Sequence, residues 1–353
     1  MQTFHAGFEP GYPPVRVCFG AGIRHSVGAE METLALQSGM VLTTPEQASQ
    51  GDAVLSALGS RGHSLFSRAT MHTPVEITEA ALKAAVGADC LIAIGGGSTI
   101  GLAKAMALRS DLPQIVLPTT YAGSEATPVL GQTANGVKET LRSPKVQPQV
   151  ILYDAELVAT LPVRMTVTSG LNAMAHAIEA LYSQDRNPLS NQLAIAGIRV
   201  FSEGLPRVVA DPGDLEARKE TQFGSWLCGA VLAQVGMALH HKLCHTLGGS
   251  FNLPHAQTHA IMLPHSASYN AKEAEAELAQ VAEIFGGSVG PGLYDFAASL
   301  GAPLALKELG LAESDLDKAA ELAVKNPYWN PRPIEQGAIR ELLQQAWEGR
   351  RPA

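Results

Sequence analysis

Five histidines lie in residues 240–259, HHKLCHTLGGSFNLPHAQTH, of a chain that has eleven histidines in 353 residues. Imidazoles can bind a metal ion, exchange protons near neutral pH or hydrogen-bond a substrate oxygen. His241 and His245 are four residues apart, which places them on one face of a helix. The segment therefore predicts a chemical site, and it leaves open whether a metal or a substrate occupies that site.

A second polar pair lies in the apolar segment 170–183, GLNAMAHAIEALYS. Asn172 and His176 are one helical turn apart, and burying each without a partner would cost about 1–3 kcal/mol. We therefore expect them to face a cavity. His255 follows a helix end and a chain reversal, so four side chains are expected to converge, namely Asn172, His176, His241 and His255.

Long helices are expected to carry these residues. Apolar periodicity predicts one helix from residue 220 to 249, ended by the Gly248–Gly249 pair. The segment before Asn172 predicts another helix, with Thr168 or Ser169 as its N-cap.

The first half of the chain predicts a different architecture, with short apolar strands alternating with helices. In LIAIGGGSTIGLAKAMAL (91–108), a buried strand runs into Gly95, Gly96 and Gly97, and Ser98 or Thr99 can cap the helix that follows. Backbone N–H groups and the dipole at such a helix start favour a phosphate. The triplet lacks the G-x-G-x-x-G spacing, so packing in a tight turn is the alternative.

A neighbouring strand end supports the phosphate interpretation. In LPTTYAGSEATP (117–128), the hydroxyls of Thr119, Thr120 and Ser124 are expected at the carboxyl edge of the same sheet, where open α/β sheets bind ligands. The strand predicted at 40–44 ends in Thr43 and Thr44 before Pro45. It lacks the acidic residue that would hydrogen-bond a ribose 2′-hydroxyl at this place. We expect NAD(H), with NADP(H) as the open alternative.

Composition sets the remaining limits. Hydrophobic residues make up 46% and charged residues 16% of the chain, and the net charge is −8 without basic runs, so neither nucleic acid nor membrane is an expected partner. Four cysteines without C-x-x-C spacing indicate reduced thiols in the cytoplasm, with Cys244 as an alternative catalytic thiol. We predict two domains, a Rossmann-like α/β dinucleotide-binding domain (1–157) and an all-α domain (158–353).

The chain resembles the iron-containing alcohol dehydrogenase superfamily, whose architecture is shared by dehydroquinate synthase and glycerol dehydrogenase. The resemblance covers nearly the whole chain and rests on GGGS (95–98), PTTYAGSE (118–125), SPKVQPQVILYDAEL (143–157), GLNAMAHAIEALYS (170–183) and HHKLCHTLGGSFNLPHAQTHA (240–260). Within the superfamily it most closely resembles the maleylacetate reductases, through Asn172 and through NPYWNPRP (326–333).

Metal-dependent members of the superfamily hold a divalent ion with one aspartate and three histidines. The matching positions here are Asn172, His176, His241 and His255, so the anionic ligand is absent. Iron and magnesium favour carboxylate oxygen, whereas three imidazoles alone can hold zinc. We therefore expect no divalent metal to be required, and we expect the histidines to serve the substrate.

The resemblance implies reduction of the C=C bond of maleylacetate, a small dicarboxylate, to 3-oxoadipate by NAD(P)H in aromatic degradation, by a homodimer. It implies three catalytic histidines and three substrate-binding residues, namely His241, His245, His176 and Asn172, His255, Tyr328. His241 and His245 would contact the substrate, and His176 with Asn172 would form the wall that fixes the enolate oxygen. Lys145 matches a family lysine near the nicotinamide ribose. Candidate carboxylate partners are Lys242, Arg164 and Arg332.

Two other functions stay open on the sequence. A metal-dependent alcohol or aldehyde dehydrogenase of the same superfamily would be chelator-sensitive and would act on simple alcohols. A non-catalytic NAD-binding protein would need no crowded imidazole pocket.

Overall fold

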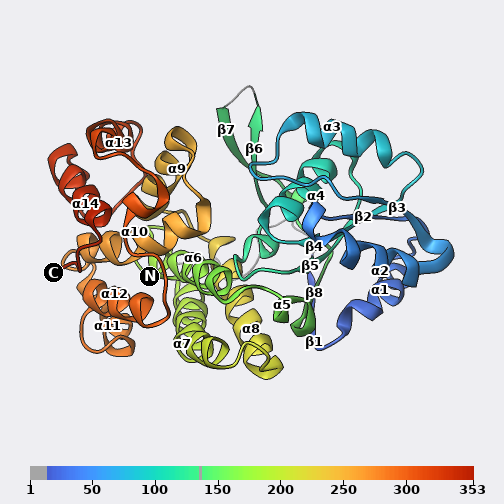
Figure 1. The fold of residues 1–353 in the computed structure, drawn as a ribbon, viewed down its shortest axis with the longest axis horizontal. Helices are drawn as coiled ribbons and strands as arrows, with labels where there is room; N and C mark the ends of the chain where they lie inside the picture. Colours follow the sequence, from blue (N-terminus) through green and yellow to red (C-terminus); the bar gives the residue numbers. More distant parts are fainter. Residues whose placement is uncertain (1–13, 135–136) are drawn as a thin grey trace, which may run out of the picture. The chain divides into compact units, whose positions relative to one another are not determined.

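The computed structural model describes residues 14–134 and 137–353 and contains two compact units (Figure 1). An α/β unit takes the described residues up to Leu161, and a helical unit comprises Pro162–Pro212 and Phe223–Ala353. The predicted fold class, a Rossmann-like α/β part followed by a helical part, is confirmed. The segment Gly213–Gln222 belongs to the α/β unit, which a single boundary after residue 157 did not foresee.

Buried polar side chains hold this returning segment in the α/β unit. The guanidinium of Arg218 is fully buried and donates hydrogen bonds to the Tyr121 hydroxyl (3.3 Å) and the Leu161 carbonyl (3.2 Å). Gln222 Nε2 donates to the carbonyl of Asp154 at 3.2 Å. A buried charge needs such acceptors, and none of this pairing can be read from the apolar pattern of the segment.

The α/β unit contains a six-stranded parallel sheet of order β1-β8-β5-β4-β2-β3. Its strands, in chain order, are β1 (Arg16–Gly20), β2 (Gly39–Leu42), β3 (Gly62–Phe66), β4 (Cys90–Gly95), β5 (Gln114–Pro118) and β8 (Val150–Asp154). The other elements are α1 (Val27–Thr33), α2 (Ala48–Leu58), α3 (Val75–Ala84), α4 (Gly97–Ser110), α5 (Ala155–Ala159) and the antiparallel hairpin β6 (Val129–Ala134) and β7 (Val137–Arg142).

Both faces of this sheet are covered, which explains why its central strand is apolar throughout. Ile92 and Ile94 of β4 pack in the core shared with α1 and α2, whereas Leu91 and Ala93 pack in the core shared with α3 and α4. Successive side chains of a strand point to opposite faces, so a strand buried on both sides has no polar alternation.

The strand order reverses its direction of growth between β2 and β4. The chain extends from β2 to β3 on one side of this point, and from β4 through β5 to β8 on the other. Open parallel sheets bind ligands at such a switch point, beyond the carboxyl ends of the strands. The glycine triplet follows β4 directly, so the topology places it at this point.

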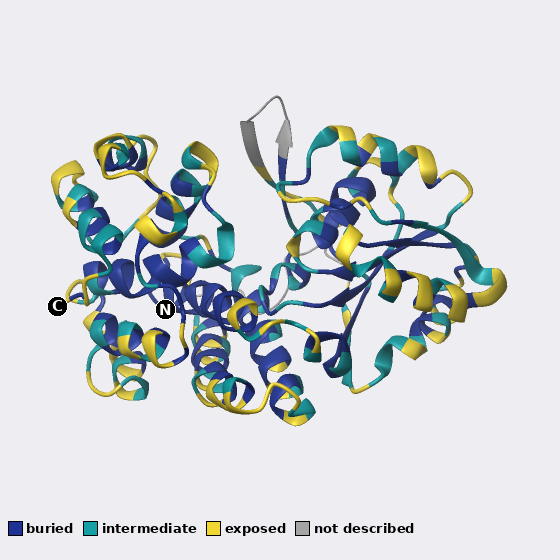
Figure 2. Ribbon diagram, viewed as in Figure 1, coloured by how far each residue is buried: buried dark blue, intermediate teal, exposed yellow. Residues whose placement is uncertain are grey.

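The helical unit is built around α6 (Val163–Leu181), whose residues from 166 to 181 are all buried (Figure 2). The other helices of this unit are α7 (Pro188–Ala210), α9 (Leu239–Phe251), α10 (His255–Asn270), α11 (Glu275–Ile284), α12 (Val289–Ser299), α13 (Leu316–Val324), α14 (Gln336–Glu348) and the end of α8 (Leu215–Leu232). Among the described helices, none is long and apolar enough to cross a lipid bilayer.

The start of α6 differs from the prediction. The helix begins at Val163 with Pro162 as its N-cap, and Thr168 and Ser169 lie inside it. The Thr168 hydroxyl donates to the carbonyl of Arg164 at 3.0 Å, one turn back along the helix. A threonine can satisfy its hydroxyl in this way within a helix, so its presence did not mark a helix start.

The predicted helix from residue 220 to 249 is two helices, because α8 ends at Leu232 and α9 begins at Leu239. The break is stabilised from α6. The Glu179 carboxylate accepts the backbone N–H groups of Ala238 (3.1 Å) and His240 (2.7 Å), which satisfies donors at the start of α9. The capping group comes from about 60 residues earlier in the chain, so local sequence could not reveal it.

The end of α9 also lies beyond its predicted position. Gly248 and Gly249 are part of the helix, which continues to Phe251 and stops at Asn252 in the left-handed conformation (φ 54°). Asparagine tolerates this conformation and replaces the expected glycine as the residue that ends the helix.

We predict that a buried histidine of α10 limits stability in acid. Both ring nitrogens of His265 are buried without a hydrogen-bond partner among the described residues, and burial lowers the pKa of its imidazole from 6.5 to about 4. The unfolded chain therefore binds a proton that the folded protein excludes between these pH values, so stability falls as the pH falls through this window. From pH 7 to pH 5, the unfolding free energy of the wild type should fall by about 2 kcal/mol more than that of His265→Phe, as measured by urea unfolding. Equal losses would contradict the prediction.

Candidate active site

Three helices of the helical unit bring histidines together. α6 contributes His176, α9 contributes His241, and α10 contributes His255 and His259. The ring centroids of His176 and His241 are 5.0 Å apart, those of His241 and His259 are 5.0 Å apart, and those of His255 and His259 are 4.3 Å apart. The predicted histidines thus belong to one cluster, and His259 links two of them.

The sequence prediction did not include His259, nor did it give His240 a role at the site. A chain of hydrogen bonds defines the state of their rings. The Ser266 hydroxyl donates to the Met262 carbonyl (2.9 Å), so it accepts from His240 Nδ1 (2.8 Å). His240 Nε2 is then the acceptor for His259 Nδ1 at 2.9 Å. This arrangement leaves His259 Nε2 with a lone pair, and it assigns one tautomer to each ring.

Several buried polar atoms of the cluster have no hydrogen-bond partner within the described part of the chain. They are Asn172 Oδ1, His176 Nδ1, His241 Nε2 and His259 Nε2. Each such atom destabilises the folded protein by about 1–3 kcal/mol unless a ligand or water satisfies it. Their concentration on facing helices indicates a binding site, because a purely structural core would not retain four of them.

Burial keeps part of this cluster neutral. Loss of solvation, followed by the nearby rings, lowers the pKa of His176, of His240 and of His259 well below 6.5. For His176 the largest neighbouring contribution comes from His241, and for His259 it comes from His255. These three rings are uncharged at neutral pH, so they serve as fixed hydrogen-bonding groups.

His241 differs from these rings because it contacts a buried carboxylate. Its Nδ1 lies 2.6 Å from Oε2 of Glu179, and both side chains are almost completely buried. Glu179 was not predicted as a site residue. The spacing in 170–183 contains a usable signal, because Glu179 follows His176 by three residues and so shares its helix face.

The outer part of the cluster is polar and partly exposed. His245 Nδ1 lies 3.1 Å from the Tyr328 hydroxyl, and Lys242 Nζ lies 5.8 Å from the Tyr328 ring centroid. Lys242, His245 and Tyr328 thus form one group, which we call the outer trio. A cation and two hydrogen-bonding groups of this kind suit a substrate carboxylate.

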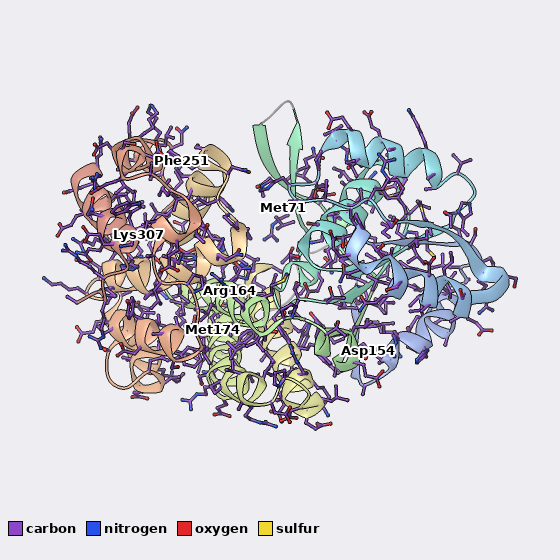
Figure 3. The ribbon with its side chains drawn as sticks, viewed as in Figure 1. Met71, Asp154, Arg164, Met174, Phe251 and Lys307 are labelled. Atoms are coloured by element: carbon purple, nitrogen blue, oxygen red, sulfur yellow. The ribbon has the colours of Figure 1, made fainter. Side chains whose placement is uncertain are left out.

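The other two candidate cations are placed differently. The Arg332 guanidinium stacks on the Tyr269 ring, with 3.9 Å between Cζ and the ring centroid, and it donates to the Tyr269 carbonyl at 3.1 Å. Arg164 is exposed near the start of α6 (Figure 3). The structure groups neither of them with the histidines.

The positions that correspond to the superfamily's metal ligands, Asn172, His176, His241 and His255, are not the residues whose ligand atoms lie closest together in the described chain. Three ligand atoms lie within 4.8 Å of one another only in the group His240, Cys244 and His259, as far as the described residues extend. In this group, His240 Nε2 and His259 Nδ1 already share a hydrogen bond of 2.9 Å. With Asn172 in place of a carboxylate, the donor set does not fit an iron ion, which favours oxygen anions.

The glycine turn and the predicted residues Thr119 and Thr120 lie together in the α/β unit. The turn after β4 leads into α4 without a side-chain N-cap, so the N–H groups at the start of this helix are available to a ligand. A Cβ added to Gly95 would lie 2.2 Å from Thr99 Oγ1, and one added to Gly96 would lie 2.8 Å from Thr120 Cγ2. A Cβ on Gly97 would meet nothing within 4 Å. Two glycines are therefore required by packing, and the third borders open space.

Side chains from neighbouring strand ends surround this turn. Gln47 Nε2 donates to Thr119 Oγ1 at 2.6 Å, and its Oε1 would lie 2.9 Å from a Cβ on Gly95. Gln47 was not predicted, because a glutamine after a strand has no local signature. Ser98 is partly exposed on the first turn of α4, and Ser124 Oγ is buried without a partner within residues 14–134 and 137–353.

A buried lysine supports the loop that carries Ser124. Lys104 Nζ donates to the carbonyls of Ser124 (2.6 Å), Thr127 (2.7 Å) and Val129 (2.9 Å). Burial lowers the pKa of this ammonium to about 7, and the nearby Glu125 opposes the shift. Lys104 extends from α4, so the helix that begins at the glycine turn also holds the neighbouring loop.

Lys145 is apart from the other predicted cofactor residues. Its ammonium pairs with Asp111 at 2.8 Å, and Asp111 follows the last residue of α4. The glycine turn is at the opposite end of this helix, about 20 Å away at 1.5 Å per residue. The structure thus does not bring Lys145 to the glycine turn.

The geometry agrees with what is found among known proteins. Residues 14–155 match the family described as iron-containing alcohol dehydrogenase, and residues 166–347 match the C-terminal region of the Fe-containing alcohol dehydrogenase family. The chain is 56% identical over 341 residues to maleylacetate reductase of Rhizobium sp. (strain MTP-10005), covering 96% of this chain and 97% of that protein. It is 51% identical to maleylacetate reductase of Burkholderia cepacia, covering 98% and 99%.

Solved structures show the same similarity. The crystal structure of maleylacetate reductase from Agrobacterium tumefaciens superimposes with a TM-score of 0.95 at 54% identity and covers 100% of both chains. The family description names iron, so it gives no support to the expectation that no divalent metal is held.

Proposed function

Because the chain belongs to the iron-containing alcohol dehydrogenase family and is an oxidoreductase similar to maleylacetate reductases over nearly its whole length, we propose that it reduces the C=C bond of maleylacetate to 3-oxoadipate. The structural observation that carries the proposal is the state of His241. This ring is held by a carboxylate at Nδ1, and its Nε2 is buried without a partner among the described residues.

The α/β unit supplies the proposed cofactor site. Gly97 leaves space at an uncapped helix start, and Ser124 Oγ lacks a partner in the described chain. These groups fit the diphosphate of a nicotinamide cofactor. NAD(H) is our first assignment and NADP(H) the second. When bound, this cofactor supplies the hydride.

The helical unit supplies the groups that handle charge and protons. Hydride addition to the carbon β to the ketone moves an electron pair onto the ketone oxygen, and the resulting enolate needs hydrogen-bond donors and then a proton at the α carbon. His241 carries that proton on Nε2 as an imidazolium beside Glu179. His176 and Asn172 line the wall next to the oxygen, and His255 and His245 complete the predicted set.

The outer trio completes the proposed recognition of a dianion. Lys242 supplies the positive charge, and His245 and Tyr328 supply hydrogen-bonding groups for one carboxylate. A homodimer in the cytoplasm remains part of the proposal. The homodimer follows from the resemblance, and the cytoplasmic location follows from the cysteine pattern of the chain.

We expect the reaction to proceed without a divalent metal. The purified protein, treated with a chelator and exchanged into metal-free buffer, should oxidise NADH with maleylacetate at a rate within about twofold of the untreated protein, because no carboxylate occupies the ligand position of Asn172. Stopped or continuous absorbance assays of NADH, together with elemental analysis, check this. Loss of activity that zinc or iron restores, or turnover of simple alcohols instead of maleylacetate, would favour a metal-dependent alcohol dehydrogenase.

A further inference from the structure

Glu179 makes three hydrogen-bond contacts with the beginning of α9. Its Oε1 accepts the backbone N–H of His240 at 2.7 Å, and its Oε2 accepts the backbone N–H of Ala238 at 3.1 Å. Oε2 also lies 2.6 Å from His241 Nδ1. Each oxygen thus accepts a backbone N–H, and a carboxylate can accept the hydrogen of His241 Nδ1 as well.

This arrangement determines which nitrogen of His241 carries hydrogen. With Glu179 as a carboxylate that accepts at both oxygens, Nδ1 of His241 is the donor in the 2.6 Å contact. The lone pair of the neutral ring is then on Nε2, which is buried and unpartnered in the described part of the chain. The ring can hold a proton on Nε2 only as an imidazolium, with the compensating negative charge on Glu179.

We infer that Glu179 is a positioning residue for the reaction, because its carboxylate couples the start of α9 to the orientation and tautomer of His241. The inference rests on the proposed function for its catalytic consequence. Glu179 touches neither the reacting atoms nor the cofactor in this assignment. It acts by presenting Nε2 of His241 in a fixed direction, in the form that can accept a proton and return it.

A single atom exchange separates this role from helix capping. Glu179→Gln keeps the side chain's size but replaces one oxygen with an NH₂ group, which can only donate. The amide oxygen can take the place of only one of the two carboxylate oxygens. The NH₂ group takes the place of the other oxygen, where it faces either the backbone N–H of His240 or His241 Nδ1. Where it faces His241, the ring must turn its lone pair to Nδ1 and carry its hydrogen on Nε2, which is the wrong tautomer for proton uptake at that atom.

A matched control exists on the same stretch of chain. The Ser183 hydroxyl donates to the carbonyl of Gly236 at 2.8 Å, so it also supports the turn before α9, and among the described residues its side chain has no hydrogen bond to a histidine. Ser183→Ala removes a buried contact of similar kind. If Glu179 only stabilised the turn, both substitutions would act alike.

The test combines kinetics with ring-nitrogen NMR on histidine-labelled protein, in which the His241 signal is identified by its loss in His241→Gln. We expect the wild type to show hydrogen on His241 Nδ1. Glu179→Gln should lower kcat about 100-fold or more with the KM for NADH within twofold, Glu179→Asp should recover part of the loss, and Ser183→Ala should keep kcat within about twofold.

Several outcomes would overturn the inference. They are a neutral His241 ring in the native protein with hydrogen on Nε2 and none on Nδ1, a normal kcat for Glu179→Gln, or an equal loss in Ser183→Ala. If Glu179→Gln does not fold, the NMR measurement on the native protein decides the question. That measurement uses no substrate, so failure of the wild type to reduce maleylacetate would refute the proposed function without touching the tautomer assignment.

Discussion

Replacing His241 with glutamine should lower kcat for maleylacetate reduction by about 100-fold or more while leaving the KM for NADH within about twofold. His241 is the histidine whose ring is bonded to a buried carboxylate and whose other nitrogen is buried without a partner in the described structure. A glutamine amide can still donate to Glu179, so the packing of α9 is retained. The amide cannot transfer a proton, so the enolate has no proton donor at this position. Steady-state kinetics with NADH and maleylacetate measure both constants.

His265→Phe is the control for the general effect of replacing a buried histidine. His265 is also buried on α10, but its ring lies near Tyr294 (6.5 Å between centroids) and shows no ring contact with the cluster among the described residues. This variant should keep kcat at pH 7. A near-normal kcat for His241→Gln, or a comparable loss in His265→Phe, would remove His241 from the chemical step.

Gly97→Ala should raise the KM for NADH about 10-fold or more without lowering the thermal midpoint of unfolding. A Cβ at this position meets no protein atom within 4 Å, so the folded protein accommodates it. The space it fills lies at the uncapped start of α4, where the cofactor phosphates are proposed to accept backbone N–H groups. The loss of one or two charge-assisted hydrogen bonds, worth about 1.5–3 kcal/mol each, accounts for the expected size. Kinetics and calorimetry on the same preparation provide the two measurements.

Two other glycines make this prediction specific. Gly95→Ala places its Cβ 2.2 Å from Thr99 Oγ1, so it should lower the unfolding midpoint. Gly337→Ala introduces the same methyl group into the first turn of α14, again with nothing within 4 Å, and should change neither property. An unchanged KM for NADH in a stable Gly97→Ala protein would show that the turn serves packing alone.

Sequence reasoning recovered most of the fold because local patterns specify it. The apolar run 91–94, followed by three glycines, predicted β4 and the turn into α4, and both are present. It failed where a distant side chain changes the local outcome. The predicted helix from residue 220 to 249 is broken between Leu232 and Leu239. There the Glu179 carboxylate accepts hydrogen bonds from backbone N–H groups at the start of the second helix.

The candidate site shows the same division. Four-residue spacing on a helix face identified the pairs Asn172–His176 and His241–His245, and the expected chain reversal added His255. It missed Glu179, His259 and Gln47, whose significance depends on contacts such as the 2.9 Å bond between His240 and His259. Family resemblance matched Lys145 to a lysine near the nicotinamide ribose, and the structure adds an ion pair of Lys145 with Asp111 at the end of α4.

The amino-acid sequence alone determined the class of fold, the family, and the replacement of an anionic metal ligand by Asn172. These features depend on residue identity and on short-range periodicity, which are present in the chain before any tertiary contact forms. The tertiary structure decided which histidines touch, which ring nitrogen each one presents, and which glycine borders open space. Hydrogen-bond direction and burial are properties of groups brought together from α6, α9 and α10, and no local stretch of sequence contains them.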